Sequence, residues 1–287
     1  MDYFQNNKAA WEEAFVHRHS GWGDENYKRL MNERLPFLDL DVAKAIEEID
    51  LNGKKVAQFC CNNGRELLSL MQLGVKLGVG FDIAENILEQ AIDTAEKAGI
   101  HNCQFVSSNI LDIPQQYNHY FDFVFFTCGA ITWFEDVVPL FQKVFDCLQP
   151  GGLLLIHDYH PFTNMLPIAG DREFDKANLN KVVYSYFRKE PWLENEGMGY
   201  MSEQYASKTF TSFTHTMSDI INSINNAKMR VVKLNEYDYD VGLCDAYNGM
   251  GFPLSYLLIA EKQACVVTDE NEDERMMTHD LNNLAGG

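Results

Sequence analysis

The sequence lacks any apolar run of about 18 residues, the length that a membrane-spanning helix requires. Its first residues, MDYFQNNKAAWEEAF, carry neither the basic start nor the apolar core of a secretory signal. The chain of 287 residues, with 46% hydrophobic and 23% charged residues, has the composition of a globular protein. We therefore expect no association with a membrane and a cytoplasmic location.

Positive charge is scarce, because 23 Lys and Arg residues stand against 42 Asp and Glu residues and give a net charge of −19. The sequence contains no cluster of Lys and Arg that would offset repulsion from a nucleic-acid backbone. The acidity is strongest at TDENEDER, residues 268–275, in a polar C-terminal segment. These charges argue against a nucleic-acid partner and favour a small-molecule substrate, with monomer and homodimer both left open.

Cysteine is scattered along the chain, and its seven residues form no even-numbered framework, so we expect no disulfide scaffold. Cys60 and Cys61 are adjacent, which suits tetrahedral zinc coordination poorly. No second Cys or His pair follows them at the spacing of metal ligands. We therefore predict no metal site and interpret both residues as small, buried thiols.

From residue 54 onward, short apolar runs alternate with segments of helical period. The first five predicted strands are KVAQFC, KLGVGFDI, CQFVSS, FDFVFFTC and LLLIHDYH. Four repeats of strand then helix predict parallel strands with right-handed crossovers. MRVVKLNEY and PLSYLLIAEK add a final hairpin. The expected fold is α/β, a doubly wound and mostly parallel sheet of seven strands in which the last strand is antiparallel.

The sheet accounts for residues 51–262, and other regions are expected around it or inserted into it. Residues 1–50 form an N-terminal helical region. Residues 161–216 interrupt the alternation, and we interpret them as an inserted cap, because a structureless loop of this length is uncommon. Within the cap, KVVYSYF and YASKTFTSF have the alternation of strands. Residues 263–287 are expected to form a disordered acidic tail.

The turn after the first strand, QFCCNNGRE at residues 58–66, contains one glycine where nucleotide-binding turns usually have several. In a doubly wound sheet, ligands bind beyond the carboxyl ends of the strands, where the strand order reverses. Asp82 ends the second predicted strand, 18 residues after Gly64. A carboxylate at that position can accept both hydroxyl groups of a ribose, although an aspartate capping the next helix is the alternative.

Two nucleoside-bearing cofactors compete for such a turn. A dinucleotide needs a glycine-rich backbone beside its pyrophosphate, but Cys60, Asn62 and Asn63 stand where those glycines would be. S-adenosylmethionine has no phosphate, and the side chains of Gln58, Asn62 and Asn63 can serve its ammonium and carboxylate groups. S-adenosylmethionine is therefore favoured over NAD.

With these motifs, the sequence resembles the class I S-adenosylmethionine-dependent methyltransferases, from about residue 54 to 160 and more loosely to 262. The resemblance implies a Rossmann-like fold. The first turn keeps only the last glycine of the family's acidic-x-Gly-x-Gly-x-Gly pattern, and CCNNGRE is similar to a variant that recurs in a branch of small-molecule-type methyltransferases. The later family motifs are matched by VGFDI, SSNILDIP, FDFVFFTCGAITWFED and LQPGGLLLIHDYH.

The resemblance also implies which residues bind the cofactor. Asp82 would hold the ribose, Ile83 would pack against the adenine, and Asn109 would accept a hydrogen bond from the adenine amino group. The full implied set is Gln58, Cys60, Asn62, Asn63, Gly64, Asp82, Ile83, Asn109, Ile110, Thr127 and Cys128.

Methyl transfer from a sulfonium is an in-line displacement, so positioning supplies much of its acceleration. His157, Asp158 and His160 follow the fifth strand and are the candidate general bases, although a histidine there is as often structural. Aromatic side chains can surround an amine or a planar acceptor, or can simply form the core of the cap. The candidate substrate-binding residues are Trp11, His19, Trp133, Tyr184 and Tyr186, with further cap aromatics at Phe187, Trp192, Tyr200 and Tyr205.

The sequence thus predicts an S-adenosylmethionine-dependent methyltransferase that acts on a nitrogen, oxygen or sulfur atom of a small molecule. Two alternatives stay open. One is a sensor or scaffold that binds S-adenosylmethionine without catalysis, and the other is an NAD-dependent oxidoreductase.

Overall fold

The computed structural model describes residues 2–243 and 245–263, so that nearly all of the predicted acidic tail lies outside the described residues. Within this part of the chain, no helix combines the length and the apolar character that crossing a membrane demands.

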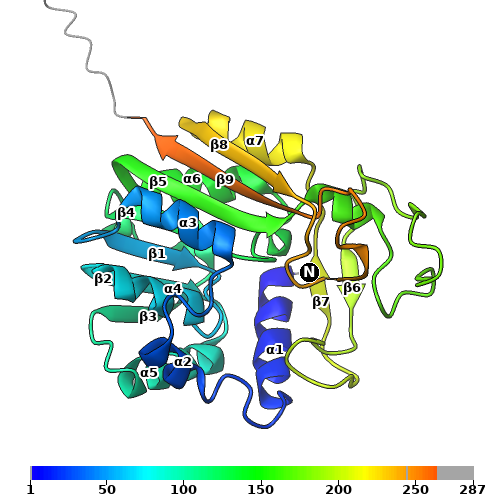
Figure 1. Ribbon diagram of the computed structural model, residues 1–287, viewed down its shortest axis with the longest axis horizontal. Coiled ribbons are helices and arrows are strands. Elements are labelled where there is room, and N and C mark those ends of the chain that lie inside the picture. Colours follow the sequence, from blue (N-terminus) through cyan, green and yellow to red (C-terminus); the bar gives the residue numbers. More distant parts are fainter. Residues whose placement is uncertain (1, 244, 264–287) are drawn as a thin grey trace, which may run out of the picture.

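A seven-stranded sheet forms the centre of the molecule (Figure 1). Its strands are β1 (Lys55–Phe59), β2 (Leu77–Asp82), β3 (Cys103–Ser107), β4 (Phe121–Phe126), β5 (Leu148–Tyr159), β8 (Met229–Tyr237) and β9 (Ser255–Lys262). They lie in the order β3-β2-β1-β4-β5-β9-β8. β1 to β5 run parallel, and β9 is antiparallel to both of its neighbours, β5 and β8. The predicted doubly wound sheet, with its antiparallel last strand, is confirmed.

Helices cover both faces of the sheet. The α-helices are α1 (Tyr3–Val16), α2 (Asn26–Asn32), α3 (Leu40–Ile49), α4 (Arg65–Leu70), α5 (Glu85–Lys97), α6 (Val137–Cys147) and α7 (Met217–Asn226). The 3-10 helices are η1 (Met71–Leu73), η2 (Ile110–Asp112), η3 (Gln115–Tyr117), η4 (Ile131–Trp133), η5 (Pro161–Met165) and η6 (Asp245–Tyr247). One apolar cluster packs α3 and α4 on one face, and another packs α6 and α7 on the opposite face. A strand covered on both faces must be apolar throughout, which explains the run in β4.

The strand order reverses between β1 and β4. β1 pairs with β2 on one side and with β4 on the other, although β4 comes later in the chain. The loops that follow β1 and β4 therefore border the crevice where ligands bind in sheets of this kind. In Figure 1, the arrowhead of β1 points toward the region of α1 and the cap.

The inserted cap contains less regular structure than the sequence predicted. Its strands β6 (Trp192–Glu194) and β7 (Phe210–Ser212) pair antiparallel over three residues each. The predicted strand at KVVYSYF is wrong, because the backbone amides of Val183 and Tyr184 both donate to the carbonyl of Met165 instead of to a neighbouring strand. Of YASKTFTSF, only the three residues of β7 are extended.

The helix α1 is joined to the cap through a buried asparagine. The Nδ2 atom of Asn7 donates to the carbonyl of Thr211 at 2.8 Å, and the amide of Thr211 donates to Oδ1 of Asn7 at 2.7 Å. Asn7 is only 4% exposed, so this pair satisfies backbone groups of β7 that water does not reach freely. α1 and the cap consequently form one cover beyond the strand ends (Figure 1).

Candidate functional site

The turn between β1 and α4 keeps a glycine-like backbone even though most of its glycines are replaced. Cys60 and Asn62 have φ angles of 55° and 50°, in the left-handed region. This conformation costs a residue with a Cβ about 1–2 kcal/mol, and asparagine tolerates it better than most. Such strain is typical of functional sites.

Gly64 completes this turn and has no tolerated replacement. Its φ angle is 69°, and a Cβ atom added there would lie 2.4 Å from Cε1 of Phe105. A similar close approach shows that Cys61 packs against β2. Its Sγ atom lies 2.7 Å from the place that a Cβ of Gly80 would take, so the thiol occupies the space of the missing side chain. Cys61 is therefore a packing residue, as the sequence predicted for both cysteines. Cys60 and Cys61 both belong to the lining of the cavity described below, but Cys61 is fully buried.

Asp82 ends β2 directly opposite the turn. Its Oδ2 atom accepts from the amide of Asn62 at 2.7 Å, and Oδ1 accepts from the amide of Ala84 at 3.1 Å. Burial raises the pKa of Asp82, and these backbone hydrogen bonds only partly oppose the rise. A carboxylate oxygen can accept more than one hydrogen bond, so Asp82 retains capacity for hydroxyl groups of a ligand.

Gln58 has an internal role. Its Nε2 atom donates to Oγ1 of Thr127 at 3.0 Å, and its Oε1 accepts from the amide of Leu67 at 3.1 Å. The side chain is 1% exposed. It thus ties the end of β1 to α4 and to the loop after β4, and both of its polar atoms are already partnered.

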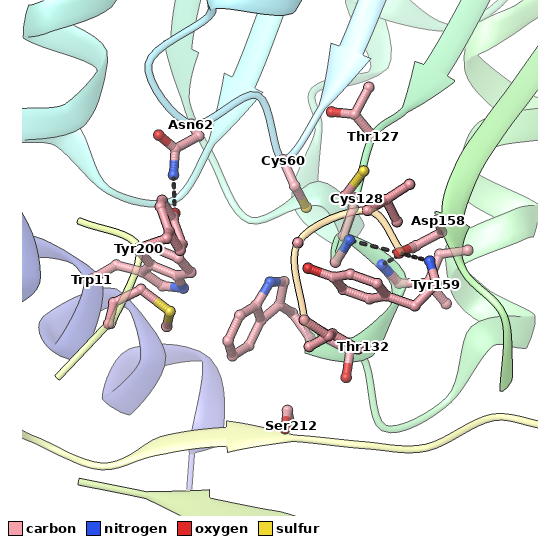
Figure 2. Close-up of a pocket in the computed structure, with 18 of the residues that line it drawn as sticks. Trp11, Cys60, Asn62, Thr127, Cys128, Thr132, Asp158, Tyr159, Tyr200 and Ser212 are labelled. Atoms are coloured by element: carbon pink, nitrogen blue, oxygen red, sulfur yellow. Dashed lines mark hydrogen bonds between the residues drawn. The ribbon is translucent and has the colours of Figure 1, made fainter. Parts of the chain in front are cut away.

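A cavity of about 1350 Å³ opens beyond the strand ends, between the sheet and the cover made by α1 and the cap (Figure 2). Its volume exceeds the roughly 300–1,000 Å³ of an ordinary ligand pocket, so it can hold a nucleoside cofactor and a second molecule. The predicted residues that line it are Trp11, Gln58, Cys60, Asn62, Asn63, Asp82, Ile83, Asn109, Ile110, Thr127, Cys128, Trp133, His157, Asp158, Tyr184, Trp192 and Tyr200. In Figure 2, Cys60 and Thr127 face it from the sheet, and Trp11, Tyr200 and Ser212 from the cover.

Six predicted residues are outside the lining of the cavity, namely His19, Tyr186, His160, Gly64, Phe187 and Tyr205. His19 is exposed, and its backbone amide donates to the carbonyl of Met201 at 2.8 Å. The hydroxyl of Tyr186 accepts from the amide of Met217 at 3.0 Å, at the start of α7. His19 and Tyr186 therefore support the cap and α7 and do not face the space for a substrate.

His160 is the third of these residues. Its Nδ1 atom accepts from the amide of Phe162 at 3.0 Å, and its Nε2 lies 2.8 Å from Oε1 of Glu236. Both ring nitrogens are thus engaged outside the cavity lining. The geometry does not support the prediction that His160 is a general base.

Asp158 and His157 both line the cavity but have different surroundings. Oδ1 of Asp158 accepts from the amides of Gly129 at 2.6 Å and Tyr159 at 2.8 Å, so the carboxylate fixes the loop after β4. Burial raises the pKa of Asp158 to about 6 in spite of these hydrogen bonds. Burial lowers the pKa of His157, although the nearby Asp39 carboxylate acts in the opposite direction. His157 is therefore a neutral imidazole near pH 7.

Three cysteines line the cavity, at Cys60, Cys61 and Cys128, and Cys60 and Cys128 are the two that packing does not account for. Burial raises the pKa of each of these two, and the negative charge of Asp158 adds to the effect. The pKa of Cys60 is raised further by Asp82. Both therefore stay protonated at neutral pH in this environment, and neither has the lowered pKa of a nucleophilic cysteine.

Sequence reasoning missed Asp39 and Trp22, which also line the cavity. Asp39 is the N-cap residue of α3, and the sequence offers only the pattern of a helix cap there. Trp22 lies beside Tyr200, with ring centroids 6.2 Å apart. Tyr200 in turn accepts a hydrogen bond from Nδ2 of Asn62 at 3.2 Å, so the cap touches the first turn directly (Figure 2). No periodic pattern in the sequence signals these long-range contacts.

Comparison with known proteins identifies the family of this chain. A family model described as "Methyltransferase domain" matches residues 51–197. An uncharacterized protein from Haemophilus influenzae is 24% identical over 194 residues, covering 65% of this chain and 71% of the relative. Demethylmenaquinone methyltransferase from Lactococcus lactis is 26% identical over 172 residues, covering 57% of this chain and 68% of the relative.

A solved structure shows the same fold. The S-adenosylmethionine-dependent methyltransferase from Clostridium acetobutylicum matches with a TM-score of 0.56 and 13% identity, covering 83% of this chain and 96% of that one. At this identity the likeness concerns the fold alone. The family model, however, spans more than half of the chain. This chain belongs to the methyltransferase domain family.

Proposed function

We propose that the protein transfers a methyl group from S-adenosylmethionine, its cofactor, to a nitrogen, oxygen or sulfur atom of a small molecule. The observation that carries this proposal is the placement of Asp82 and the strained first turn at the edge of a cavity large enough for two molecules. The family and the fold support it. A small-molecule acceptor is favoured by the resemblance of CCNNGRE to a variant of the turn in small-molecule-type methyltransferases.

The residues at the strand ends suit this cofactor. Asp82 would hold the ribose hydroxyls, and Asn62 and Asn63 would serve the methionine end, although their Nδ2 atoms donate to Tyr200 and to Gln90. Oδ1 of Asn109 accepts from the amide of Leu111 at 3.1 Å and has a second lone pair for the adenine amino group. Within the cavity lining, Arg65 is the single Lys or Arg side chain, which suits a cofactor without phosphate better than a dinucleotide. When bound, S-adenosylmethionine supplies an electrophilic methyl group on a sulfonium.

The chain contributes chiefly by positioning the reactants and excluding water. α1 and the cap cover the cavity, and the hydrogen bond between Asn62 and Tyr200 joins the cap to the turn. Of the predicted bases, His157 is the one that we keep, because its Nδ1 atom lies at the cavity wall beside Asp39 and Cys128. Asp158 is held by the amide of Gly129, and His160 is paired with Glu236.

The lining favours an acceptor that is neutral or positively charged. Its acidic residues are Asp39, Glu66, Asp82, Asp158, Asp171, Glu194, Glu196 and Asp240. Arg65 is paired with Glu66 at 2.8 Å, and burial together with Asp171 raises the pKa of Glu194. An anionic acceptor would be repelled by this field. The rings of Trp11 and Trp133, 5.3 Å apart, offer apolar and π surfaces for an amine or a planar acceptor.

The proposal is tested with S-adenosylmethionine labelled in its methyl group and a panel of amines, thiols and phenols. Demethylmenaquinone joins the panel because a relative at 26% identity is named for it. We expect labelled product from a neutral or cationic acceptor and much less from its anionic counterpart. Binding of the cofactor without any product would contradict the transfer and favour a sensor or scaffold. Binding of NADH alone would favour the oxidoreductase.

A further inference from the structure

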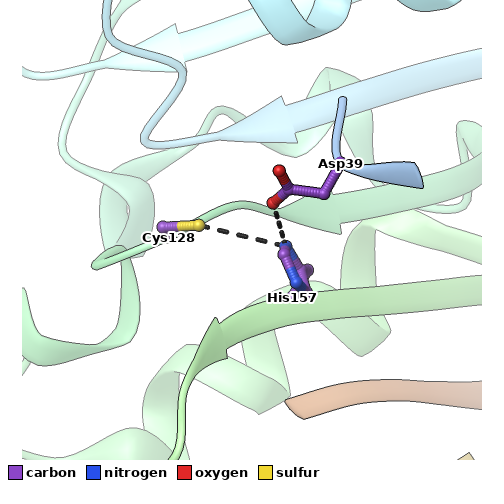
Figure 3. A group of neighbouring side chains, drawn as sticks. All are labelled: Asp39, Cys128 and His157. Carbon is purple, nitrogen blue, oxygen red and sulfur yellow. Dashed lines mark hydrogen bonds and ion pairs between the residues drawn. The ribbon is translucent and has the colours of Figure 1, made fainter. Parts of the chain in front are cut away.

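Three side chains from separate elements converge on one point of the cavity wall (Figure 3). Asp39 precedes α3, Cys128 lies in the loop after β4, and His157 lies in β5. Nδ1 of His157 is 3.6 Å from Oδ2 of Asp39 and 3.9 Å from Sγ of Cys128. Asp39, Cys128 and His157 each offer one ligand atom, and these atoms all lie within 4.8 Å of one another.

This arrangement is not that of a nucleophilic triad. In a triad, the nucleophile and the carboxylate approach opposite nitrogens of the histidine ring, so that a proton can pass along the chain. Here the thiol and the carboxylate both approach Nδ1. The separation of Nδ1 and Oδ2 is too long for a hydrogen bond, and the contact of Sγ with Nδ1 is a long hydrogen bond. The donor atoms therefore surround a common centre.

Two of these side chains also lack the partners that they would ordinarily have. His157 is 2% exposed, and its Nε2 atom has no hydrogen-bond partner among the described residues. Buried polar groups normally have one. Asp39 stands at the N-cap of α3 but makes no capping hydrogen bond. A ligand at the point that Asp39 and Nδ1 of His157 face would engage the uncapped carboxylate of Asp39. The Nε2 atom of His157 points away from that ligand.

We propose that Asp39, Cys128 and His157 bind a divalent metal ion of the zinc class, which displaces the proton of the Cys128 thiol to solvent, with a fourth position open to the cavity. Tetrahedral zinc at about 2.0–2.3 Å from its ligands sets neighbouring ligand atoms about 3.3–3.7 Å apart, close to the observed contacts. A set of carboxylate, thiolate and imidazole suits zinc better than magnesium or calcium, which prefer oxygen ligands. Three protein ligands and one open position are typical of catalytic zinc sites.

The cluster is accessible to an ion because the side chain of Asp39 is 54% exposed and Cys128 is exposed toward the cavity. The site differs from the first turn, where the adjacent cysteines predicted no metal. It does not depend on the proposed function. Only its role does: in methyl transfer, the ion would bind the acceptor's thiol or hydroxyl at the open position and lower its pKa.

The site is tested by titrating the full chain, treated with a chelator, with Zn²⁺ alone and with Co²⁺ alone. We expect one equivalent of ion per chain and, with Co²⁺, the charge-transfer absorption of a thiolate ligand. Cys128→Ser should abolish that absorption, and Asp39→Asn and His157→Gln should each weaken Zn²⁺ binding at least about ten-fold. Cys103→Ser is the matched control, because Cys103 is a half-buried thiol outside the cavity lining, and it should change neither result.

Asp39→Asn keeps the test valid if the His157 variant does not fold, because the side chain of Asp39 is largely solvent-exposed. Circular dichroism establishes that each variant is folded. Failure of the parent chain to bind either ion, or equal affinity in the parent, Asp39→Asn and Cys128→Ser, would overturn the site. Since neither methyl donor nor acceptor is present, that result would leave the proposed methyl transfer untouched.

Discussion

The turn after β1 and the inserted cap border the same cavity, but they are held in place in different ways. The turn is fixed by backbone conformation and close packing, with left-handed φ angles at Cys60, Asn62 and Gly64. The cap has two strands of three residues, and it is held by hydrogen bonds to α1 and to the turn and by a small apolar cluster that joins Met201 and Phe210 to α1. The comparison indicates a rigid side for the cofactor and a side for the acceptor that is more easily opened.

The largest effect is expected from Gly64→Ala, which attacks the rigid side. The new Cβ would clash with Phe105 and would hold a strained φ angle, so we expect a loss of about 3 kcal/mol or more in the free energy of unfolding. Gly53→Ala is the matched control, because its φ angle is 71° and no atom lies within 4 Å of the added Cβ. Its loss should be about 1 kcal/mol. Equal losses in denaturant titrations would refute the packing argument.

A smaller effect, confined to the cover, is expected from Asn7→Ala. The change removes both hydrogen bonds to the backbone of Thr211 and leaves its amide and carbonyl without them, at a cost of about 2 kcal/mol. We expect much faster hydrogen exchange at the amide of Thr211 and unchanged exchange in β1. The neighbouring variant Asn6→Ala, at an exposed position, should leave both rates unchanged. Uniformly faster exchange throughout the sheet would contradict a separately held cover.

Asp82→Asn tests whether the rigid side of the cavity binds the cofactor. A hydrogen bond to a charged group contributes about 1.5–3 kcal/mol, so the affinity for S-adenosylmethionine should fall roughly 10- to 100-fold while the fold is kept. Calorimetric titration measures this change. An unchanged affinity would mean that Asp82 does not hold the ribose.

The raised pKa of Asp82 predicts opposite effects of pH on the binding of the cofactor and on the stability of the free protein. The ionised carboxylate accepts the ribose hydroxyls, so affinity should fall on acidification at a higher pH than the ordinary value of 3.8 implies. The folded state without cofactor binds this proton more tightly than the unfolded state. The contribution of the Asp82 carboxyl group to the free energy of unfolding is therefore full below pH 3.8, and it is lost as the pH rises through the folded-state pKa. Asp82→Asn should remove the part of each dependence that comes from Asp82, and the part of the stability dependence that comes from Asp158, whose pKa is about 6, should remain.

The smallest effect is expected from Tyr200→Phe, which breaks the hydrogen bond between the cap and the turn. A single neutral hydrogen bond contributes about 0.5–1.5 kcal/mol. We expect faster release of the cofactor by less than about ten-fold and an unchanged free energy of unfolding for the sheet. Tyr186→Phe, in the cap but outside the cavity lining, is the control and should not change the release rate.

The sequence was sufficient to predict the sheet and the position of Asp82, because buried parallel strands form continuous apolar runs between helical segments. It was not sufficient for the cap. Alternation in KVVYSYF indicates one apolar face but does not say whether a partner strand is present, and the chain hydrogen-bonds to Met165 instead.

For the candidate bases too, local sequence patterns do not predict the partners that come from distant parts of the chain. His160 follows β5, as predicted, but its partner Glu236 comes from β8, far along the chain. Asp39 reads locally as a helix cap, yet its carboxylate faces His157. A cytoplasmic location, the absence of a nucleic-acid partner, and a monomeric or homodimeric state stay predictions from composition and charge.

The most direct test is a crystal structure of the protein grown with S-adenosylhomocysteine, the demethylated form of the cofactor. The account predicts its adenosine across the carboxyl ends of β1 and β2, with the ribose hydroxyls donating to the carboxylate of Asp82. An adenosine bound elsewhere, or Asp82 without contact to the ribose, would contradict it.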